Sequence, residues 1–223
     1  MAAFAIGACD TSSEGPADTC AIHWREGHYG SALAAGAVAV DGGALVLSDS
    51  VPRDPNIFQS GEVVGLWLDR DSNLFGPHTE RFTFSSLAFT APAGSLELIL
   101  TWSMGVAPAV VHIDGDGAFT ISMTGEDVTN ASGKLSRLDA GVTVELAWLS
   151  PSLAVEARVI DPDGSVVVGR RPYFNGGMLT SALRLKAPEA SGSATARLDR
   201  FELVGNGSGS FVDDFDCLSV HSY

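Results

Sequence analysis

The chain has 223 residues, of which 45% are hydrophobic, so it can bury the core of one large β-sandwich or of two small domains. Twenty-seven acidic side chains oppose 13 basic ones and give a formal net charge of −14. Such a field repels phosphate backbones and anionic membrane surfaces, which disfavours nucleic-acid binding. No apolar run approaches the roughly 20 residues that a transmembrane helix requires, so no transmembrane segment is expected.

Residues 1–20 are mostly small, polar and acidic, which is typical of a leader or linker. The stretch from Ile6 to Cys9 is similar to the end of a lipoprotein signal, in which Cys9 would carry the lipid. The basic region that should precede such a signal is missing, so a leader without this role is the alternative.

Three cysteines, at positions 9, 20 and 217, bear on the compartment. Because the two ends of a domain often lie close together, a Cys20–Cys217 disulfide would join them, and a Cys9–Cys20 bond is the local alternative. No pair has CxxC spacing, so neither zinc nor thioredoxin-like chemistry is supported. We expect an oxidising environment, either extracellular or at the cell surface, to which the acidic, lysine-poor composition is also suited.

From about Gly36 onward, short β-branched and apolar runs alternate with turns rich in Gly, Pro, Asp and Ser. This pattern predicts about twelve strands and no helix. Several runs alternate apolar and polar residues, which indicates an antiparallel sandwich in which each sheet has one buried face. The predicted strands are Ala37–Val40, Ala44–Ser48, Val63–Leu68, Arg81–Phe89, Leu96–Trp102, Ala109–Ile113, Phe119–Met123, Val142–Trp148, Leu153–Ile160, Val166–Gly169, Leu179–Leu185 and Ala194–Val204.

Turn residues predict three hairpins, at positions 41–43, 114–117 and 161–164. The last long strand changes its alternation once: Ala196 and Leu198 share a face with Phe201 and Leu203 only after a shift of one residue. This shift predicts a β-bulge near Asp199.

Four segments together resemble the concanavalin A-like, laminin-G-like superfamily of bacterial extracellular proteins: Gly43–Leu47, Val142–Trp148, Asp161–Gly164 and Ala196–Leu203. The resemblance implies an all-β, two-sheet antiparallel jelly-roll sandwich, which we place over residues 21–204. It also implies a non-catalytic extracellular or cell-surface module that binds a glycan or a protein.

Residues 205–223 are predicted to form a Gly/Ser linker followed by a terminal strand or tail. Asp213–Asp216 is similar to the opening strand of such modules. It would start a second module, pair with its own sheet, or pair with the open edge of a neighbouring chain. In the last case the chain would be a structural subunit of a surface assembly joined by strand exchange, which is our alternative function.

The superfamily includes glycoside hydrolases, in which two carboxyl groups act together. The closely spaced acids of this chain lie mostly at turns and include no Glu, so we expect no enzyme activity. A glycan-active hydrolase with atypical carboxylates is the second alternative. The same acids would suit a structural Ca²⁺ ion, which takes several oxygen ligands. One candidate site is Asp114 with Asp116, and the other is Asp69, Asp71 and Asn73; ordinary turn residues are the alternative for the first pair.

Aromatic side chains are the usual partners of sugar rings, and one segment combines them with polar groups. It holds Arg170, Arg171, Tyr173, Phe174 and Asn175, and we predict that it binds a ligand if it is exposed. The alternative is that its aromatic residues close one end of the sandwich. A further candidate is Trp67, whereas Trp102 and Trp148 are expected in the core and His112 in a rim or packing position.

Overall fold

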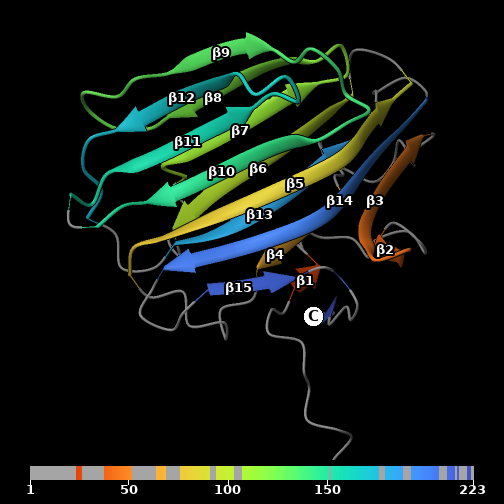
Figure 1. Cartoon of the computed structure of the whole chain (residues 1–223), viewed down its shortest axis with the longest axis horizontal. Coiled ribbons are helices and arrows are strands. Elements are labelled where there is room, and N and C mark those ends of the chain that lie inside the picture. The colour runs from red at the N-terminus through yellow and green to blue at the C-terminus, as the bar shows by residue number, and fades with distance from the viewer. Residues whose placement is uncertain are drawn as a thin grey trace, which may run out of the picture.

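A computed structural model describes residues 24–26, 38–51, 64–68, 76–90, 94–102, 107–150, 152–175, 179–187, 192–205, 210–213, 215 and 220–221. All regular elements among these residues are strands, and they form two sheets (Figure 1). Within the same ranges, no helix combines the length and hydropathy that a membrane-spanning helix requires.

The first sheet, sheet A, contains eight strands, and every neighbouring pair is antiparallel except β1 with β16. In spatial order they are β16 (Val220–His221), β1 (Trp24–Glu26), β4 (Val64–Leu68), β13 (Leu179–Lys186), β6 (Ser95–Trp102), β7 (Ala109–Asp114), β8 (Ala118–Met123) and β9 (Ala131–Lys134).

The second sheet, sheet B, also contains eight strands, all of them antiparallel. The long strand β14 pairs with β5 along one edge and, along the other, first with β3 and then with β15. The spatial order is β12 (Val166–Arg171), β11 (Val155–Ile160), β10 (Val142–Trp148), β5 (His78–Phe89), β14 (Gly192–Gly205), β3 (Ala44–Val51) and β2 (Val38–Asp41), with β15 (Ser210–Asp213) beside β14 (Figure 1).

The core lies between the sheets because alternate residues of each strand point inward. Phe82 and Phe84 of β5 are fully buried, and the ring of Phe82 lies 4.9 Å from that of Phe201 on β14. The register of β14 against β5 shifts on both sides of Leu198, which confirms the predicted bulge. The shift lets Leu198 and Phe201 both face the core although they are an odd number of positions apart, with two residues between them.

All twelve predicted strands are present, and the three predicted hairpins connect β2 with β3, β7 with β8, and β11 with β12. In the last of these, the amide of Gly164 donates to the carbonyl of Asp161 at 2.8 Å, and the φ of +89° at Gly164 suits glycine. Several boundaries differ from the predicted ones: β3 extends to Val51, β5 begins at His78, and β11 begins only at Val155, after Leu153, which has a φ of +53°.

The sequence did not predict β1, β9 or β16. Strand β9 consists of Ala131, Ser132, Gly133 and Lys134, so no apolar alternation marks it. Strand β9 forms because it pairs with the edge of β8. The residues of β9 are half-buried or exposed. Such short edge strands depend on pairing rather than on hydrophobic pattern.

The C-terminal segment belongs to the same two sheets. Strand β15 pairs with the end of β14, from Phe201 to Val204, and Phe215 is fully buried in the core. Strand β16 pairs with β1 in sheet A. Pairing of β15 with a neighbouring chain therefore has no support among the residues that the structure describes.

Candidate functional site

A row of polar side chains crosses the outward face of sheet A. Cross-strand register pairs Arg184 of β13 with Glu97 of β6, Glu97 with His112 of β7, and His112 with Thr120 of β8. Because residues directly opposite each other in a sheet lie on the same face, all four share one side. Their chain neighbours, among them Leu96, Leu98, Val111 and Ile113, are buried, which places the row on the outside. We call these four residues the polar row.

His112 lies between two carboxylates. Its Nδ1 is 3.2 Å from Oε1 of Glu97, and its Nε2 is 2.8 Å from Oδ1 of Asp114. A protonated imidazole would donate to both oxygens at once. The His112 side chain is 33% exposed, so the group is neither buried nor fully solvated.

The two partners change each other's protonation. The hydrogen bond to Glu97 raises the pKa of His112 above 6.5; burial opposes this shift, and the bond and charge of Asp114 reinforce it. The hydrogen bond from His112 lowers the pKa of Glu97 below 4.5, although burial acts in the opposite direction. The positive charges of His112, Arg184 and Lys186 lower this pKa further. Glu97 is therefore an ionised hydrogen-bond acceptor at neutral pH, and the charged form of His112 is favoured.

A second, mostly apolar row runs beside the polar row. Register aligns Ala182 of β13, Ile99 of β6, Val110 of β7 and Ser122 of β8 on the same outward face. Ala182 and Ile99 are buried although they point away from the core, and Val110 is half-buried. The two rows together are thus polar on one side and mostly apolar on the other, as a sugar ring is. The backbone also pairs Trp67 with Ala182, at the end of this second row.

The polar row offers charged acceptors and donors but no evident acid catalyst. Glycoside hydrolysis requires a carboxylic acid that keeps its proton near the working pH, which means a raised pKa. The pKa of Glu97 is shifted in the opposite direction. A histidine acting as a general base must be neutral, and the raised pKa of His112 works against that state. These shifts suit hydrogen bonding to hydroxyl groups better than proton transfer.

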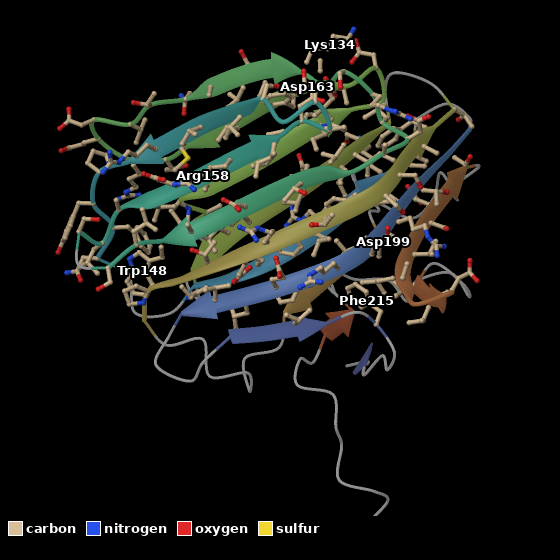
Figure 2. The ribbon with its side chains drawn as sticks, in the orientation of Figure 1. Lys134, Trp148, Arg158, Asp163, Asp199 and Phe215 are labelled. Carbon is tan, nitrogen blue, oxygen red and sulfur yellow. The ribbon has the colours of Figure 1, made fainter. Side chains whose placement is uncertain are left out.

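The segment that the sequence singled out for ligand binding lies at one end of the sandwich, away from the polar row. Arg171 donates from Nε to the carbonyl of Tyr173 at 2.9 Å and from Nη1 to the carbonyl of Thr124, and its guanidinium lies 4.9 Å from the ring centre of Phe174. Phe174 is buried and meets Trp148 edge-on at 6.5 Å. These two aromatic rings close the end of the sandwich, where Figure 2 labels Trp148.

The rest of that segment is open to solvent. Tyr173 is 55% exposed, and Asn175 is exposed beside it. Arg170 is also exposed, and its Nε lies 3.5 Å from Oε1 of Glu156. The structure thus divides the predicted set into a part that anchors the segment, the buried Phe174 with the half-buried Arg171, and an exposed part, Tyr173 with its neighbours.

Two of the acids predicted to bind calcium, Asp114 and Asp116, accept hydrogen bonds within the protein. Asp114 accepts from His112, and Asp116 accepts from the amide of Ala118 at 3.0 Å, as in an Asx turn. Among the described residues, no three His, Cys, Asp or Glu side chains form a cluster that could hold a metal ion. The other predicted residues lie outside the described ranges: Asp69, Asp71, Asn73, Cys20 and Cys217.

Sequence reasoning did not select Glu97 or Arg184 and gave His112 only a rim or packing role. A usable signal was present, because each of these residues interrupts a run of large apolar residues: Leu-Glu97-Leu, Val-His112-Ile and Leu-Arg184-Leu. A charged residue flanked by two core residues on a strand must face outward. The alternation therefore showed the face of each residue but not their common location.

No protein-family model matches the sequence, and no curated protein matches it either. Comparison with solved structures does find similar chains. A legume lectin-like domain from Entamoeba histolytica has a TM-score of 0.53 at 6% sequence identity, covering 83% of this chain and 90% of that one. The alginate lyase AlgAT5 of polysaccharide lyase family 7 has a TM-score of 0.54 at 12% identity, covering 75% of this chain and 81% of that one.

A sialidase gives a TM-score of 0.51 at 14% identity, and the matched part covers 80% of this chain but only 16% of the sialidase. At such identities the comparisons establish the fold alone. That fold is the concanavalin A-like jelly roll, as the sequence predicted.

Proposed function

We propose that this chain is a non-catalytic carbohydrate-binding module that acts outside the cell or at its surface, and that the polar row with Asp114 is its sugar-binding site. The observation that carries the proposal is the bonding of His112 to two half-exposed carboxylates on the outward face of sheet A. Sugar hydroxyls both donate and accept hydrogen bonds, so they match a site in which ionised carboxylates alternate with cationic donors.

Two further features support a sugar over another ligand. Val110, which is half-buried, lies on the same face of β7 as His112, so a ring could place its C–H face on Val110 and its hydroxyls on the polar row. The similar solved structures include a legume lectin-like domain and an alginate lyase. The pKa directions of Glu97 and His112 favour the binding role over catalysis.

A glycan array with the full chain, followed by calorimetry on the glycans that bind, tests this function. Hydrogen bonds to charged groups contribute about 1.5–3 kcal/mol, so Glu97→Gln and His112→Ala should each weaken binding roughly 10- to 100-fold. Asp139→Asn is the control, because Asp139 is also a carboxylate with a pKa lowered by a hydrogen bond, here from Arg137, but it lies in the loop between β9 and β10. Binding by this control should be unchanged.

No response to any glycan on the array, or an equal loss of affinity in all three variants, would contradict the proposal. The enzymatic alternative has its own readout. Incubation with alginate and with neutral polysaccharides should release neither unsaturated nor reducing ends. Cleavage that disappears in His112→Ala would replace the binding module with a glycan-active enzyme.

A further inference from the structure

Sheet B also presents a row of charges on its outward face, at right angles to its strands. Register pairs Arg158 of β11 with Glu145 of β10, Glu145 with Arg81 of β5, and Arg81 with Glu202 of β14. Ion pairs follow the register, at 3.3 Å from Arg158 to Glu145, 2.6 Å from Arg81 to Glu145 and 2.9 Å from Arg81 to Glu202. Figure 2 labels Arg158 on this sheet. We call these four residues the charge row.

An exposed valine continues the charge row at each end. Val168 of β12 pairs with Arg158, and Val212 of β15 pairs with Glu202. Val166 lies two residues from Val168 on β12, and Val204 lies two residues from Glu202 on β14, so both share the same face. All four valines are exposed, and they make up four of the six large apolar side chains found exposed among the described residues. The face therefore has a charged centre and two apolar margins.

The order of the side chains across this face is complementary to the same order read in the opposite direction. From β12 to β15 it reads Val168, Arg158, Glu145, Arg81, Glu202, Val212. Reading it backwards exchanges every arginine with a glutamate and each valine with the other. A two-fold axis between β10 and β5 would therefore set each arginine opposite a glutamate of a second copy. Such self-complementarity is the requirement for a symmetric, isologous interface.

We propose that this face of sheet B is the interface of a two-fold symmetric homodimer. In that dimer Arg158 meets the partner's Glu202, Arg81 meets the partner's Glu145, and Val168 meets the partner's Val212. The two-fold axis generates each contact twice.

The cost of covering these charges is low because the monomer has already buried its anions. The side chains of Glu145 and Glu202 are only 6% and 17% exposed, whereas those of Arg81 and Arg158 are 44% and 40% exposed. Association would therefore mainly cover guanidinium groups, which are planar and weakly hydrated. Arginine is enriched and lysine depleted at protein interfaces. The two lysines of the chain, Lys134 and Lys186, both lie in sheet A.

Electrostatics also favours this face over others for a second copy. Two chains of net charge −14 repel each other in general. Around the charge row, however, four arginines outnumber the three glutamates with which they pair. The arginines are Arg81, Arg158, Arg170 and Arg200, and the glutamates are Glu145, Glu156 and Glu202. The neighbouring pair Arg197 and Asp199 is balanced.

The dimensions suit a stable contact. Six strands about 4.8 Å apart place the margins about 24 Å from each other, and strands of about 20–40 Å give roughly 500–1,000 Å² for each copy. Stable interfaces bury about 800 Å² for each partner. Stacked sheets rotate by about 30°, which displaces each margin by about one residue of the same face. Each margin carries two valines, so apolar contact survives this rotation.

The dimer would leave sheet A of both copies facing outward. The two polar rows would then point in opposite directions, so one dimer could join two separate glycan chains rather than bind one surface twice. The interface does not depend on the proposed sugar site, so either proposal can fail without the other.

Sedimentation velocity of the full chain over a range of concentrations, with two double variants, tests the dimer. Val168→Lys with Val212→Glu places opposite charges across the two-fold axis and should dimerise at least as tightly as the natural chain. Val168→Lys with Val212→Lys places like charges there and should raise the Kd at least roughly tenfold. Both substituted positions are exposed in the monomer, and thermal melts check that both variants fold. The Kd of the natural chain should also rise with salt, because screening weakens the charge row.

Two results would overturn the interface. One is a natural chain that stays monomeric at every concentration, and the other is an equal Kd for the two double variants. Calorimetry of the lysine double variant with a bound glycan should show unchanged intrinsic affinity per chain, which separates this test from that of the sugar site.

Discussion

Removing one member of the buried His78–Glu80 pair is predicted to destabilise the fold far more than removing both. Both side chains lie on the inward face of β5, in line with Phe82 and Phe84, and Glu80 is 0% exposed. Nε2 of His78 lies 3.0 Å from Oε1 of Glu80, and Nδ1 of the same ring lies 2.8 Å from the carbonyl oxygen of Gly76. Oε2 of Glu80 and Nε1 of the nearby Trp148 have no hydrogen-bond partner among the described residues.

The expected magnitudes follow from the burial. His78→Phe leaves a carboxylate without its partner in the core, and breaking a buried pair in this way costs about 3–5 kcal/mol. For a chain of this size the loss corresponds to a fall in Tm of roughly 6–20 °C. His78→Phe combined with Glu80→Leu removes both charges and the unpaired oxygen. Replacing a whole buried pair by apolar residues is often neutral or stabilising, so the double variant should stay within about 1 kcal/mol of the natural chain.

The pair also fixes the direction of a pH dependence. Burial lowers the pKa of His78, but the hydrogen bond and charge of Glu80 and the Gly76 carbonyl outweigh it and raise the pKa above 6.5. The folded state therefore holds the proton more tightly than the unfolded chain does. The stability that this contributes is fully present below about pH 6.5 and is lost as the pH rises through the raised pKa. The double variant should lack this loss.

Urea unfolding of the natural chain and both variants at pH 6 and at pH 9 measures the cost of the single substitution, the cost of the double substitution and the pH dependence of the stability. The natural chain should be less stable at the higher pH, and the double variant should change less. The reasoning would be refuted by a cost below about 1 kcal/mol for His78→Phe, because an unpaired buried charge cannot be that inexpensive. A double variant as unstable as the single one would refute it equally.

Three other predictions concern the core, the terminal segment and the sugar site. Ser181→Ala should be neutral or slightly stabilising in urea unfolding, because its buried hydroxyl has no partner among the described residues. Ser136→Ala, which removes a hydroxyl that donates to a turn carboxylate, should instead cost about 1–3 kcal/mol, and equal effects would contradict both assignments. Phe215→Ala should cost about 3–5 kcal/mol, since the ring is fully buried; a cost near zero would place the C-terminal segment outside the fold. Glycan affinity should hold down to pH values near 4.5, where Glu97 is still ionised, and fall as the pH rises through the raised pKa of His112, and a pH-independent affinity measured by calorimetry would contradict this role.

The strands of this protein were readable because their signals are local. The alternation of Phe82 and Phe84 in β5 reflects a backbone whose successive side chains point to opposite faces, and no distant residue is needed to see it. The bulge near Asp199 was visible for the same reason, since it interrupts that period. Strand β9 was missed because its four residues acquire their strand conformation from the edge of β8.

The segment predicted to bind a ligand shows the limit of local sequence signals. The sequence identified Arg171, Tyr173 and Phe174 as a notable combination, and it stated both possible roles. Only the packed structure shows that Phe174 is buried against Trp148 and lies under the half-buried Arg171, while Tyr173 stays exposed. Composition does not determine which of two adjacent aromatic residues fills a gap between strands that are distant in sequence.

The sequence by itself determined the strands, most of their turns and the face on which each residue lies, because these depend on a period of two residues and on turn chemistry. Tertiary structure alone decided the order of the strands within each sheet. That order aligns Arg184 with Glu97 and His112 on sheet A, and Arg158 with Glu145, Arg81 and Glu202 on sheet B. Pairing between strands far apart in the chain depends on the packing of the whole core, so neither row could be assembled from local pattern.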